Sequence, residues 1–289
     1  MASGHQSRPP SEETESTPAA GEANGGGSLT VIGTGIRTVG QLTVEAIAWM
    51  QEADSLLYVV GDSIAEEVIQ RLNPKGAASL SGYYAEGLPR IQTYEAMVGH
   101  ILASVSAGNK TVAAFYGHPG VFAYPSHESI RRARAGGYPA QMLPGISAED
   151  CLFADLGVDP AIGGCQSYEA TDFLLNYRLI DPSSQLILWQ IGTLGDWTYK
   201  TQRYDLRAFP LLVQRLAEVY PIAHDVTVYE AAVFPGCQPM VKSMPLYLLN
   251  ENEVTAATTL YVPASRPPNP NVRMQQLFGL LTGALASTI

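Results

Sequence analysis

The 289-residue sequence contains few cysteines and no long apolar run, and each of these features excludes some classes of protein. Its three cysteines, Cys151, Cys165 and Cys237, form no Cys-x-x-Cys pair and cannot all pair with one another, which indicates a reduced, cytoplasmic protein. No apolar stretch approaches the roughly 20 residues that a membrane span needs. The first five residues resemble neither a secretion signal nor an import signal. We therefore expect that the protein neither spans a membrane nor is exported.

Positive charge is also scarce. The chain has 17 Lys and Arg against 27 Asp and Glu, which gives a formal net charge of −10. Because nucleic acids are bound through clustered Lys and Arg, we expect no nucleic-acid partner.

The hydrophobic fraction of 46% with only 15% charged residues is sufficient for the core of one large or two small domains.

Several catalytic motifs are absent as well. Thr38 stands where the dinucleotide-binding motif G-x-G-x-x-G would have its third glycine, so that motif is disfavoured. No G-K-[ST] occurs, so a phosphate-binding P-loop is disfavoured as well. The lack of a G-x-S-x-G elbow weakens an α/β-hydrolase interpretation. His118 and His127 lie nine positions apart without an acidic cluster, so we expect no metal site. Cys151 follows two acidic residues at a predicted helix start and is expected to be a structural thiol.

What the sequence does contain is an alternation of apolar strands and helical patterns. Strands are predicted at residues 29–32, 55–60, 111–116, 139–143, 185–190, 226–229 and 258–262. Helices are predicted at residues 43–53, 64–72, 93–107, 126–135 and 209–220. Continuous apolar strands that alternate with helices are typical of the α/β class with a buried, mainly parallel sheet.

Composition marks the domain boundaries. Residues 1–27 are rich in Ser, Glu, Pro, Ala and Gly and cannot bury enough apolar area to offset their ordering entropy, so they are predicted to be a disordered tail. The alternating pattern predicts an N-terminal α/β lobe over 28–150 and a C-terminal α/β lobe over 151–264. Four prolines between 263 and 270 mark the next boundary, and 265–289 is predicted as a Pro-rich segment with a short helix.

Four predicted strand ends carry unusual turns. They are rich in Gly and Pro or carry Trp and Gln, at residues 33–35, 116–120, 144–148 and 189–190. Ligands of open α/β sheets gather at the carboxyl ends of strands, where Gly lets the backbone approach a ligand closely. Each turn alone is most simply an ordinary βα turn, but four in one chain favour a ligand cleft.

A second concentration of chemistry lies in residues 81–94. It holds three tyrosines and Arg90 in a connection that also carries Gly and Pro. If a helix starts near Thr93, Arg90 and Tyr94 share one side of its entry. An aromatic staple that holds a long loop explains the pattern equally well, so the residues alone leave both interpretations open.

The residues at 31–35, 41–43, 116–122 and 144–148 resemble the tetrapyrrole (corrin/porphyrin) methylase superfamily. This resemblance implies a homodimer in which two α/β lobes hold S-adenosylmethionine (SAM) in the cleft between them. The segments at 83–94, 147–156 and 168–174 are similar, more specifically, to the borosin peptide α-N-methyltransferases. Borosin enzymes methylate backbone amide nitrogens of a ribosomally made peptide, and the likeness covers roughly residues 28–264.

Carried over by position, the resemblance implies catalytic roles for Arg90, Tyr94, Tyr84 and Tyr116. It implies SAM contacts at Tyr116, His118, Val121, Phe122, Ser147, Ala148, Gln190, Tyr229, Ala231, Thr258 and Thr259. The positional match is weakest over 193–208. Ser81 stands where the fungal enzymes have a further aromatic residue, so the peptide groove is expected to differ in shape.

The acceptor chemistry determines what these residues must do. An amide nitrogen is a poor nucleophile because its lone pair is delocalised into the carbonyl group. We expect Arg90 to lower the pKa of Tyr94 so that Tyr94 acts as a base, or Tyr94 to polarise the amide toward its imidate. Tyr84 and Tyr116 would position the amide and the methyl group.

The expected substrate is a separate precursor peptide in a 2:2 complex with the homodimer. Fused borosin proteins continue into a helical clasp and a C-terminal core peptide, whereas this sequence ends soon after Pro263. Self-methylation of the apolar residues 277–289 is the less favoured arrangement. Two alternative functions remain: a tetrapyrrole-methylase branch that acts on a precorrin, ribosomal RNA or diphthamide intermediate, and a non-catalytic SAM- or peptide-binding subunit.

Overall fold

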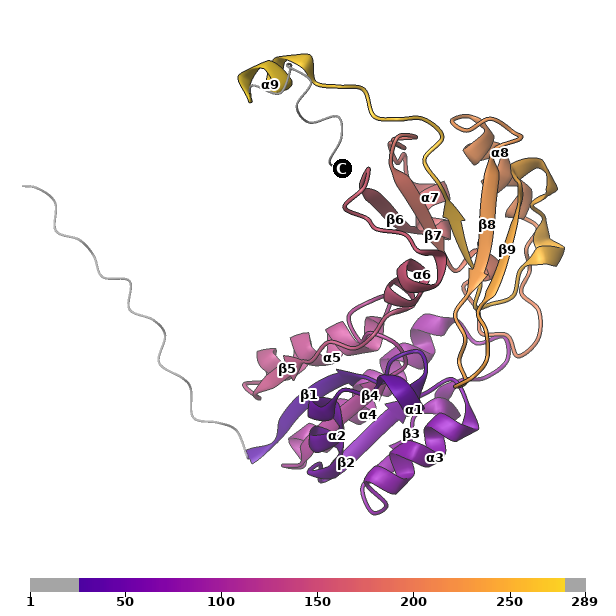
Figure 1. The fold of residues 1–289 in the computed structure, drawn as a ribbon. Helices are drawn as coiled ribbons and strands as arrows, with labels where there is room; N and C mark the ends of the chain where they lie inside the picture. Colours follow the sequence, from indigo (N-terminus) through magenta and orange to yellow (C-terminus); the bar gives the residue numbers. More distant parts are fainter. Residues whose placement is uncertain (1–25, 279–289) are drawn as a thin grey trace, which may run out of the picture.

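The computed structural model describes residues 26–278, which form two sheets covered by helices (Figure 1). Most of the predicted tail and residues 279–289 lie outside the described residues. The first sheet, in the order β3-β2-β4-β1-β5, has only parallel strand pairs. Its strands are β1 (Ser28–Gly33), β2 (Ser55–Val59), β3 (Ala77–Ser79), β4 (Lys110–Phe115) and β5 (Ala140–Met142). The helices of this lobe are α1 (Thr38–Gln41), α2 (Val44–Gln51), α3 (Ser63–Leu72), α4 (Arg90–Ser106) and α5 (Tyr124–Ala135).

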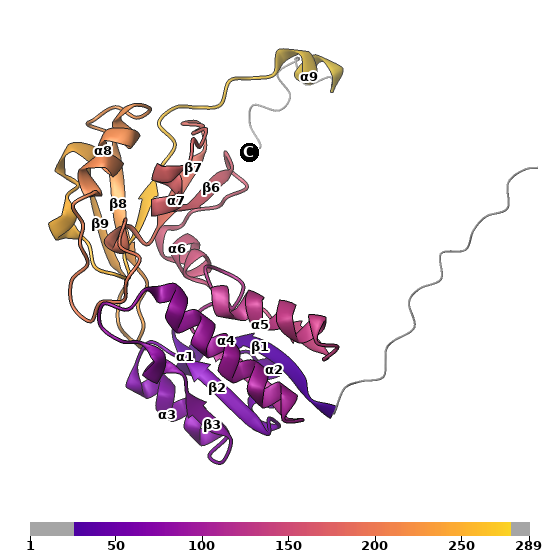
Figure 2. The same ribbon diagram turned by 180° about the vertical axis from the view of Figure 1, so that it is seen from behind.

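Both faces of the first sheet are buried, which explains why its central strands are apolar throughout. On one face Val31 packs in the same cluster as Met97 of α4 and as residues of α5. On the other face Ile32 packs in a cluster with Met50 of α2 and Ile69 of α3. Figure 1 shows α2 in front of the strands, whereas Figure 2, seen from behind, shows α4 in front of them. This lobe is therefore the buried parallel sheet that the sequence pattern predicts.

The second sheet has the order β6-β7-β10-β8-β9 and is mixed. Its strands are β6 (Cys165–Glu169), β7 (Gln185–Trp189), β8 (Asp225–Glu230), β9 (Met240–Pro245) and β10 (Thr259–Val262). Only β6 and β7 pair in parallel, and the other three pairs are antiparallel. The expectation of a mainly parallel sheet is therefore wrong for this lobe. The short connection from β8 to β9 allows only a hairpin, because parallel neighbours need a longer crossover.

The helices of the second lobe bury both faces of its sheet. They are α6 (Ala148–Leu156), α7 (Ala170–Leu175) and α8 (Phe209–Ala217), and α9 (Val272–Leu277) follows in the Pro-rich segment. Phe173 of α7 and Leu212 of α8 share a core cluster on one face, whereas Leu152 of α6 packs with Ile187 and Tyr229 on the other. Short 3-10 helices are present at Ser81–Tyr83, Ile191–Thr193, Leu246–Leu248 and Glu251–Glu253.

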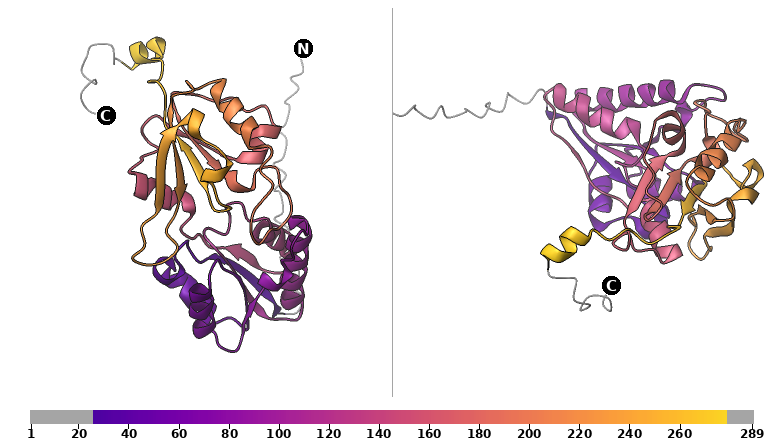
Figure 3. Two further views of the ribbon diagram at one scale, coloured as in Figure 1. Left: turned by 90° about the vertical axis from the view of Figure 1, so that its right-hand side faces the viewer. Right: turned by 90° about the horizontal axis from the view of Figure 1, so that it is seen from above.

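The chain passes from the first sheet to the second through α6, which lies between the lobes in Figure 1. Ser147 and Asp150 form a reciprocal capping box that fixes the start of this helix. The views in Figure 3 show α9 projecting away from both lobes. Within residues 26–278, no helix has the length and apolar character needed to cross a membrane.

Candidate active site

A cavity of about 350 Å³ lies between the two lobes. The first lobe contributes Tyr84, residues of α4 and residues that follow β4. The second lobe contributes the start of α6, the end of β7 and residues next to β10. Its volume falls in the range of small-molecule binding pockets. Its lining includes Tyr84, Tyr94, Tyr116, Gly117, His118, Val121, Phe122, Ser147, Ala148, Glu149, Trp189, Gln190, Ala256, Ala257 and Thr259.

Three of the predicted glycine turns meet one another, and two of them, at 116–120 and 144–148, line this cavity. Gly35 and Gly117 form an isolated bridge with hydrogen bonds of 3.2 and 3.0 Å between their backbones. A Cβ atom on Gly33 would lie 2.3 Å from the Gly117 carbonyl oxygen, and one on Gly145 would lie 2.7 Å from the same oxygen. Both separations are shorter than real Cβ contacts allow. Glycine is therefore required here because three turns from different parts of the chain pack backbone against backbone.

Two residues of the cavity wall have strained backbones. Phe122 has φ 51° and Gln190 has φ 59°, and they are the two non-glycine residues with positive φ in the described part of the chain. Both line the cavity, one from each lobe. The centroid of the Phe122 ring lies 6.0 Å from that of the Trp189 ring, so the two lobes pack together through aromatic side chains. Backbone strain of this kind concentrates at functional sites, where the surroundings hold it in place.

The structure brings most of the predicted SAM contacts onto this cavity. The predicted residues that line it are Tyr116, His118, Val121, Phe122, Ser147, Ala148, Gln190 and Thr259. The Ser147 hydroxyl is already engaged, because it donates to Asp150 Oδ2 at 2.7 Å and accepts from the Asp150 N–H at 3.2 Å. Ser147 therefore serves first as the cap of α6.

Tyr229, Ala231 and Thr258 are not among the residues that line the cavity. Tyr229 is fully buried in β8, and its hydroxyl donates to Asp155 at 2.7 Å. The buried Thr258 hydroxyl donates to Glu230 at 2.5 Å. Tyr229 and Thr258 support the wall from behind because their polar groups are already paired inside the second lobe. Ala231 follows β8 and packs against the same cluster as Tyr229.

Arg90 is held by the opposite lobe. It is the first residue of α4, and its backbone N–H donates to the Trp197 carbonyl at 2.9 Å. Its guanidinium donates to the Asp196 carbonyl and lies 5.8 Å over the ring of Tyr204. Tyr94 lies one helical turn further on, which places it beside Arg90 as predicted.

The segment 196–204 of the second lobe completes this cluster, and the sequence did not reveal it. The ring of Tyr199 packs against that of Tyr84, with centroids 4.7 Å apart and planes tilted by 33°. Its N–H also donates to the Leu88 carbonyl at 2.9 Å, so a short backbone bridge links the lobes. The aromatic residues of this irregular connection were the only feature of the sequence that could have indicated its place in the cluster. Glu149 of α6 is a further cavity residue that was not predicted.

The pKa values of the cavity tyrosines are all raised. Burial raises the pKa of Tyr84 well above 10, and it raises that of Tyr116 to about 12. Burial also raises the pKa of Tyr94, and the adjacent Arg90 lowers it by a smaller amount. The expectation that Arg90 brings the Tyr94 pKa below its ordinary value is therefore wrong in its net effect. At neutral pH these hydroxyl groups are protonated and can donate hydrogen bonds.

The described residues contain no group of three or more His, Cys, Asp or Glu side chains placed to hold a metal ion. All three cysteines are free. Cys151 lies 3.5 Å from the Gln41 side-chain amide, and burial raises its thiol pKa. A thiol with a raised pKa is a poor nucleophile, which agrees with a structural role.

Comparison with known proteins gives one family over most of the chain. Residues 28–242 match the tetrapyrrole (corrin/porphyrin) methylases. The chain is 39% identical over 259 residues to the methyltransferase/cyclic peptide gymnopeptides precursor of Gymnopus fusipes, covering 88% of this chain and 61% of that protein. It is 40% identical over 241 residues to the corresponding omphalotin A precursor of Omphalotus olearius, covering 82% and 58%. The chain thus spans about 60% of the length of these relatives.

Solved structures show the same fold at low sequence identity. A cobalt precorrin-4 methyltransferase superposes with a TM-score of 0.61 at 15% identity, covering 82% of this chain and 94% of that one. A uroporphyrin-III C-methyltransferase of Thermus thermophilus, in complex with S-adenyl homocysteine, gives 0.54 at 15% identity, covering 82% and 92%. Fold, glycine turns and family match agree: the chain belongs to the tetrapyrrole (corrin/porphyrin) methylases.

Proposed function

We propose that this chain is a SAM-dependent methyltransferase that methylates backbone amide nitrogens of a ribosomally made precursor peptide. The observation that carries the proposal is that Tyr84, Tyr94 and Tyr116 line one cavity, with Arg90 one helical turn from Tyr94 on α4. The names of the relatives support it, because they combine a methyltransferase with a cyclic peptide precursor.

The cavity fits SAM in size and in chemistry. SAM supplies a methyl group on a positively charged sulfur, which is a good leaving group. The aromatic side chains of Tyr116, Phe122 and Trp189 line the cavity and can face a cation favourably. Gln190 and Thr259 add polar groups, and Gly117 lets a ligand approach the backbone closely. The S-adenyl homocysteine bound by a structural neighbour supports the same choice.

The raised pKa values favour one of the two predicted roles for Tyr94. A protonated Tyr94 donates a hydrogen bond to the acceptor carbonyl oxygen and thereby favours the imidate form of the amide. Arg90 lies beside it and stabilises the negative charge that develops on that oxygen. Tyr84 and Tyr116 border the same space and orient the peptide group and the methyl group. The bond between the methyl group and sulfur would break as the bond from nitrogen to the methyl group forms, and the amide proton would be released to solvent.

We also propose that the active form is a cytoplasmic homodimer that binds its precursor in a 2:2 complex. Leu175, the last residue of α7, is 71% exposed, and Tyr177 and Leu179 in the loop that follows are 93% and 80% exposed. Such an apolar group suits a protein contact. A separate precursor stays a prediction, because the relatives' names place the precursor and the methyltransferase in one protein.

No specific observation favours the alternative functions. The neighbours that act on uroporphyrin or precorrin are 15–18% identical, and this likeness reflects the fold. A non-catalytic subunit would not need three tyrosines around one cavity with an arginine beside one of them.

Mass spectrometry tests the proposed function and the arrangement together. The protein is incubated with SAM and a synthetic peptide rich in Val, Ile, Gly and Ala, and the masses of peptide and protein are both recorded. Mass steps of one methylene unit on the peptide support a substrate supplied separately. Steps on the protein instead support self-methylation. No methylation of either, together with methylation of uroporphyrinogen III, would overturn the proposal.

A further inference from the structure

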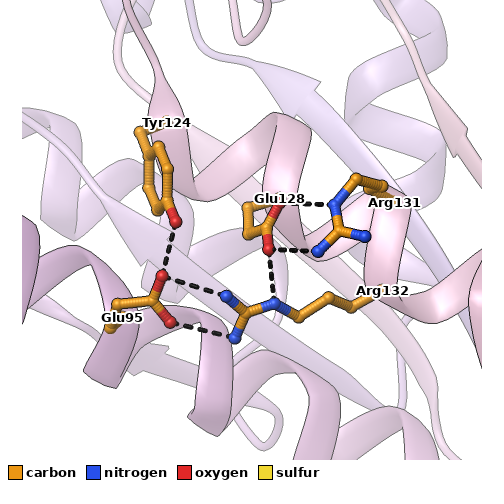
Figure 4. Close-up of polar contacts among 5 residues, drawn as sticks. All are labelled: Glu95, Tyr124, Glu128, Arg131 and Arg132. Atoms are coloured by element: carbon orange, nitrogen blue, oxygen red, sulfur yellow. Dashed lines mark hydrogen bonds and ion pairs between the residues drawn. The ribbon is translucent and has the colours of Figure 1, made fainter.

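A network of polar side chains, drawn in Figure 4, lies outside the cavity lining and includes Glu95, the neighbour of Tyr94 in the sequence. The ring of Tyr124, the first residue of α5, stacks against Tyr94 with centroids 6.2 Å apart and planes 24° apart. The Tyr124 hydroxyl donates to the carboxylate of Glu95, which is the neighbour of Tyr94 on α4. One helix thus provides Tyr94, and the other provides the ring that packs on it.

The Glu95 carboxylate is itself held at both oxygens. Arg132 of α5 donates to Oε1 at 2.9 Å and pairs with Oε2 at 2.9 Å (Figure 4). The Arg132 Nε donates to Glu128 at 2.5 Å, and Arg131 donates to both oxygens of Glu128 at 2.6 and 2.7 Å. A guanidinium that bridges two carboxylates fixes geometry better than an isolated exposed pair. The side chain of Glu128 is only 14% exposed, which agrees with a fixed position.

The same network lies next to the strained part of the cavity wall. Phe122 and Ala123 immediately precede Tyr124, and Pro125 follows it; all three line the cavity. Ala123 is the N-cap of α5 and offers no side-chain hydrogen bond to the helix. The start of α5 therefore lacks an ordinary cap, and the Tyr124–Glu95 hydrogen bond links it to α4 instead.

We propose that Glu95 and Tyr124 are positioning residues for Tyr94. Glu95 fixes the Tyr124 hydroxyl, so the Tyr124 ring stays packed on Tyr94 and keeps the Tyr94 hydroxyl aimed into the cavity. The kinetic consequence rests on the proposed function, whereas the position of the Tyr94 ring does not. Hydrogen bonding and ion pairing agree with this arrangement, because Tyr124 and Arg132 both lower the pKa of Glu95 and keep it an anionic acceptor.

The test compares Tyr124→Phe with the wild-type protein. This change keeps the stacked ring and removes only the hydroxyl. A misplaced acceptor group slows the chemical step, so we expect kcat for peptide methylation to fall about tenfold, while KM for the peptide and the Kd for SAM stay within about twofold. Glu95→Gln keeps an acceptor and loses the ion pair, so the fall is expected to be smaller. Arg71→Gln, which breaks an exposed pair on α3, is the matched control and should leave kcat unchanged.

A crystal structure of Tyr124→Phe supplies the readout that does not depend on the substrate. A displaced or disordered Tyr94 ring supports the proposal even if the wild-type protein methylates no peptide, in which case only the proposed function fails. An unmoved Tyr94 ring, or an unchanged kcat in both Tyr124→Phe and Glu95→Gln, overturns the positioning role. An equal loss of kcat in Arg71→Gln also overturns it.

Discussion

Replacing Tyr94 by Phe isolates the hydroxyl that the proposed chemistry needs. Tyr94 lines the cavity, and its ring stacks on Tyr124, a contact that Phe retains. Removing one donor that stabilises developing negative charge costs about 2.7–4 kcal/mol in the transition state, or about 100- to 1000-fold in kcat. The loss should appear in kcat, because the ring still fills the same space and the SAM contacts are unchanged.

The assay measures methylated peptide by mass spectrometry and SAM binding by calorimetry. Tyr138→Phe is the matched control, because Tyr138 packs partly buried in the same core cluster as Tyr94 and does not line the cavity. We expect Tyr138→Phe to keep wild-type kcat and Tyr94→Phe to keep wild-type SAM affinity. A Tyr94→Phe enzyme that works at nearly the wild-type rate would refute the reasoning, as would a loss that lies entirely in SAM binding.

Four further predictions concern the same site. Because burial raises the Tyr94 pKa above 10, kcat should be flat from pH 7 to pH 9; a tenfold rise per pH unit would instead indicate a Tyr94 phenolate as base. Arg90→Ala should retain SAM binding by calorimetry and lose methylation, and methylation at the wild-type rate would contradict its role. Gly33→Ala places a Cβ 2.3 Å from the Gly117 oxygen, so SAM affinity should fall sharply; unchanged affinity would show that these turns can move apart. Asp150→Ala breaks the capping box of α6 and should lower the free energy of unfolding by about 1 kcal/mol in denaturant titration, whereas no change would mean that the cap is dispensable.

The sequence predicts the first sheet well because its central strands are buried on both faces. β1, β2 and β4 therefore appear as continuous apolar runs. The second sheet is harder to predict because its outer strands are partly exposed. Three of the six residues of β9 are exposed, among them Lys242 and Ser243, so it has no apolar run to detect. β6 has the same problem, since none of its five residues is fully buried.

The parts of the site that can be predicted from the sequence are those where only one residue type fits the geometry. The glycine turns could be recognised because only Gly allows the contact between Gly33 and Gly117. The contacts of Arg90 with Asp196 and Tyr204 could not be predicted, because they join an irregular connection to a helix more than 100 residues away. The net shift of the Tyr94 pKa was also out of reach, since it depends on how far burial outweighs the neighbouring guanidinium.

Transfer of a labelled methyl group tests the central claim most directly. The protein is incubated with SAM that carries a deuterated methyl group and with a peptide rich in Val, Ile, Gly and Ala, and fragmentation of every labelled chain locates the label. The account predicts label on backbone amide nitrogens, appearing about 100- to 1000-fold more slowly when Tyr94→Phe replaces the wild-type protein. Label on a side chain, label on uroporphyrinogen III in place of a peptide, or no transfer to any peptide nitrogen would contradict it.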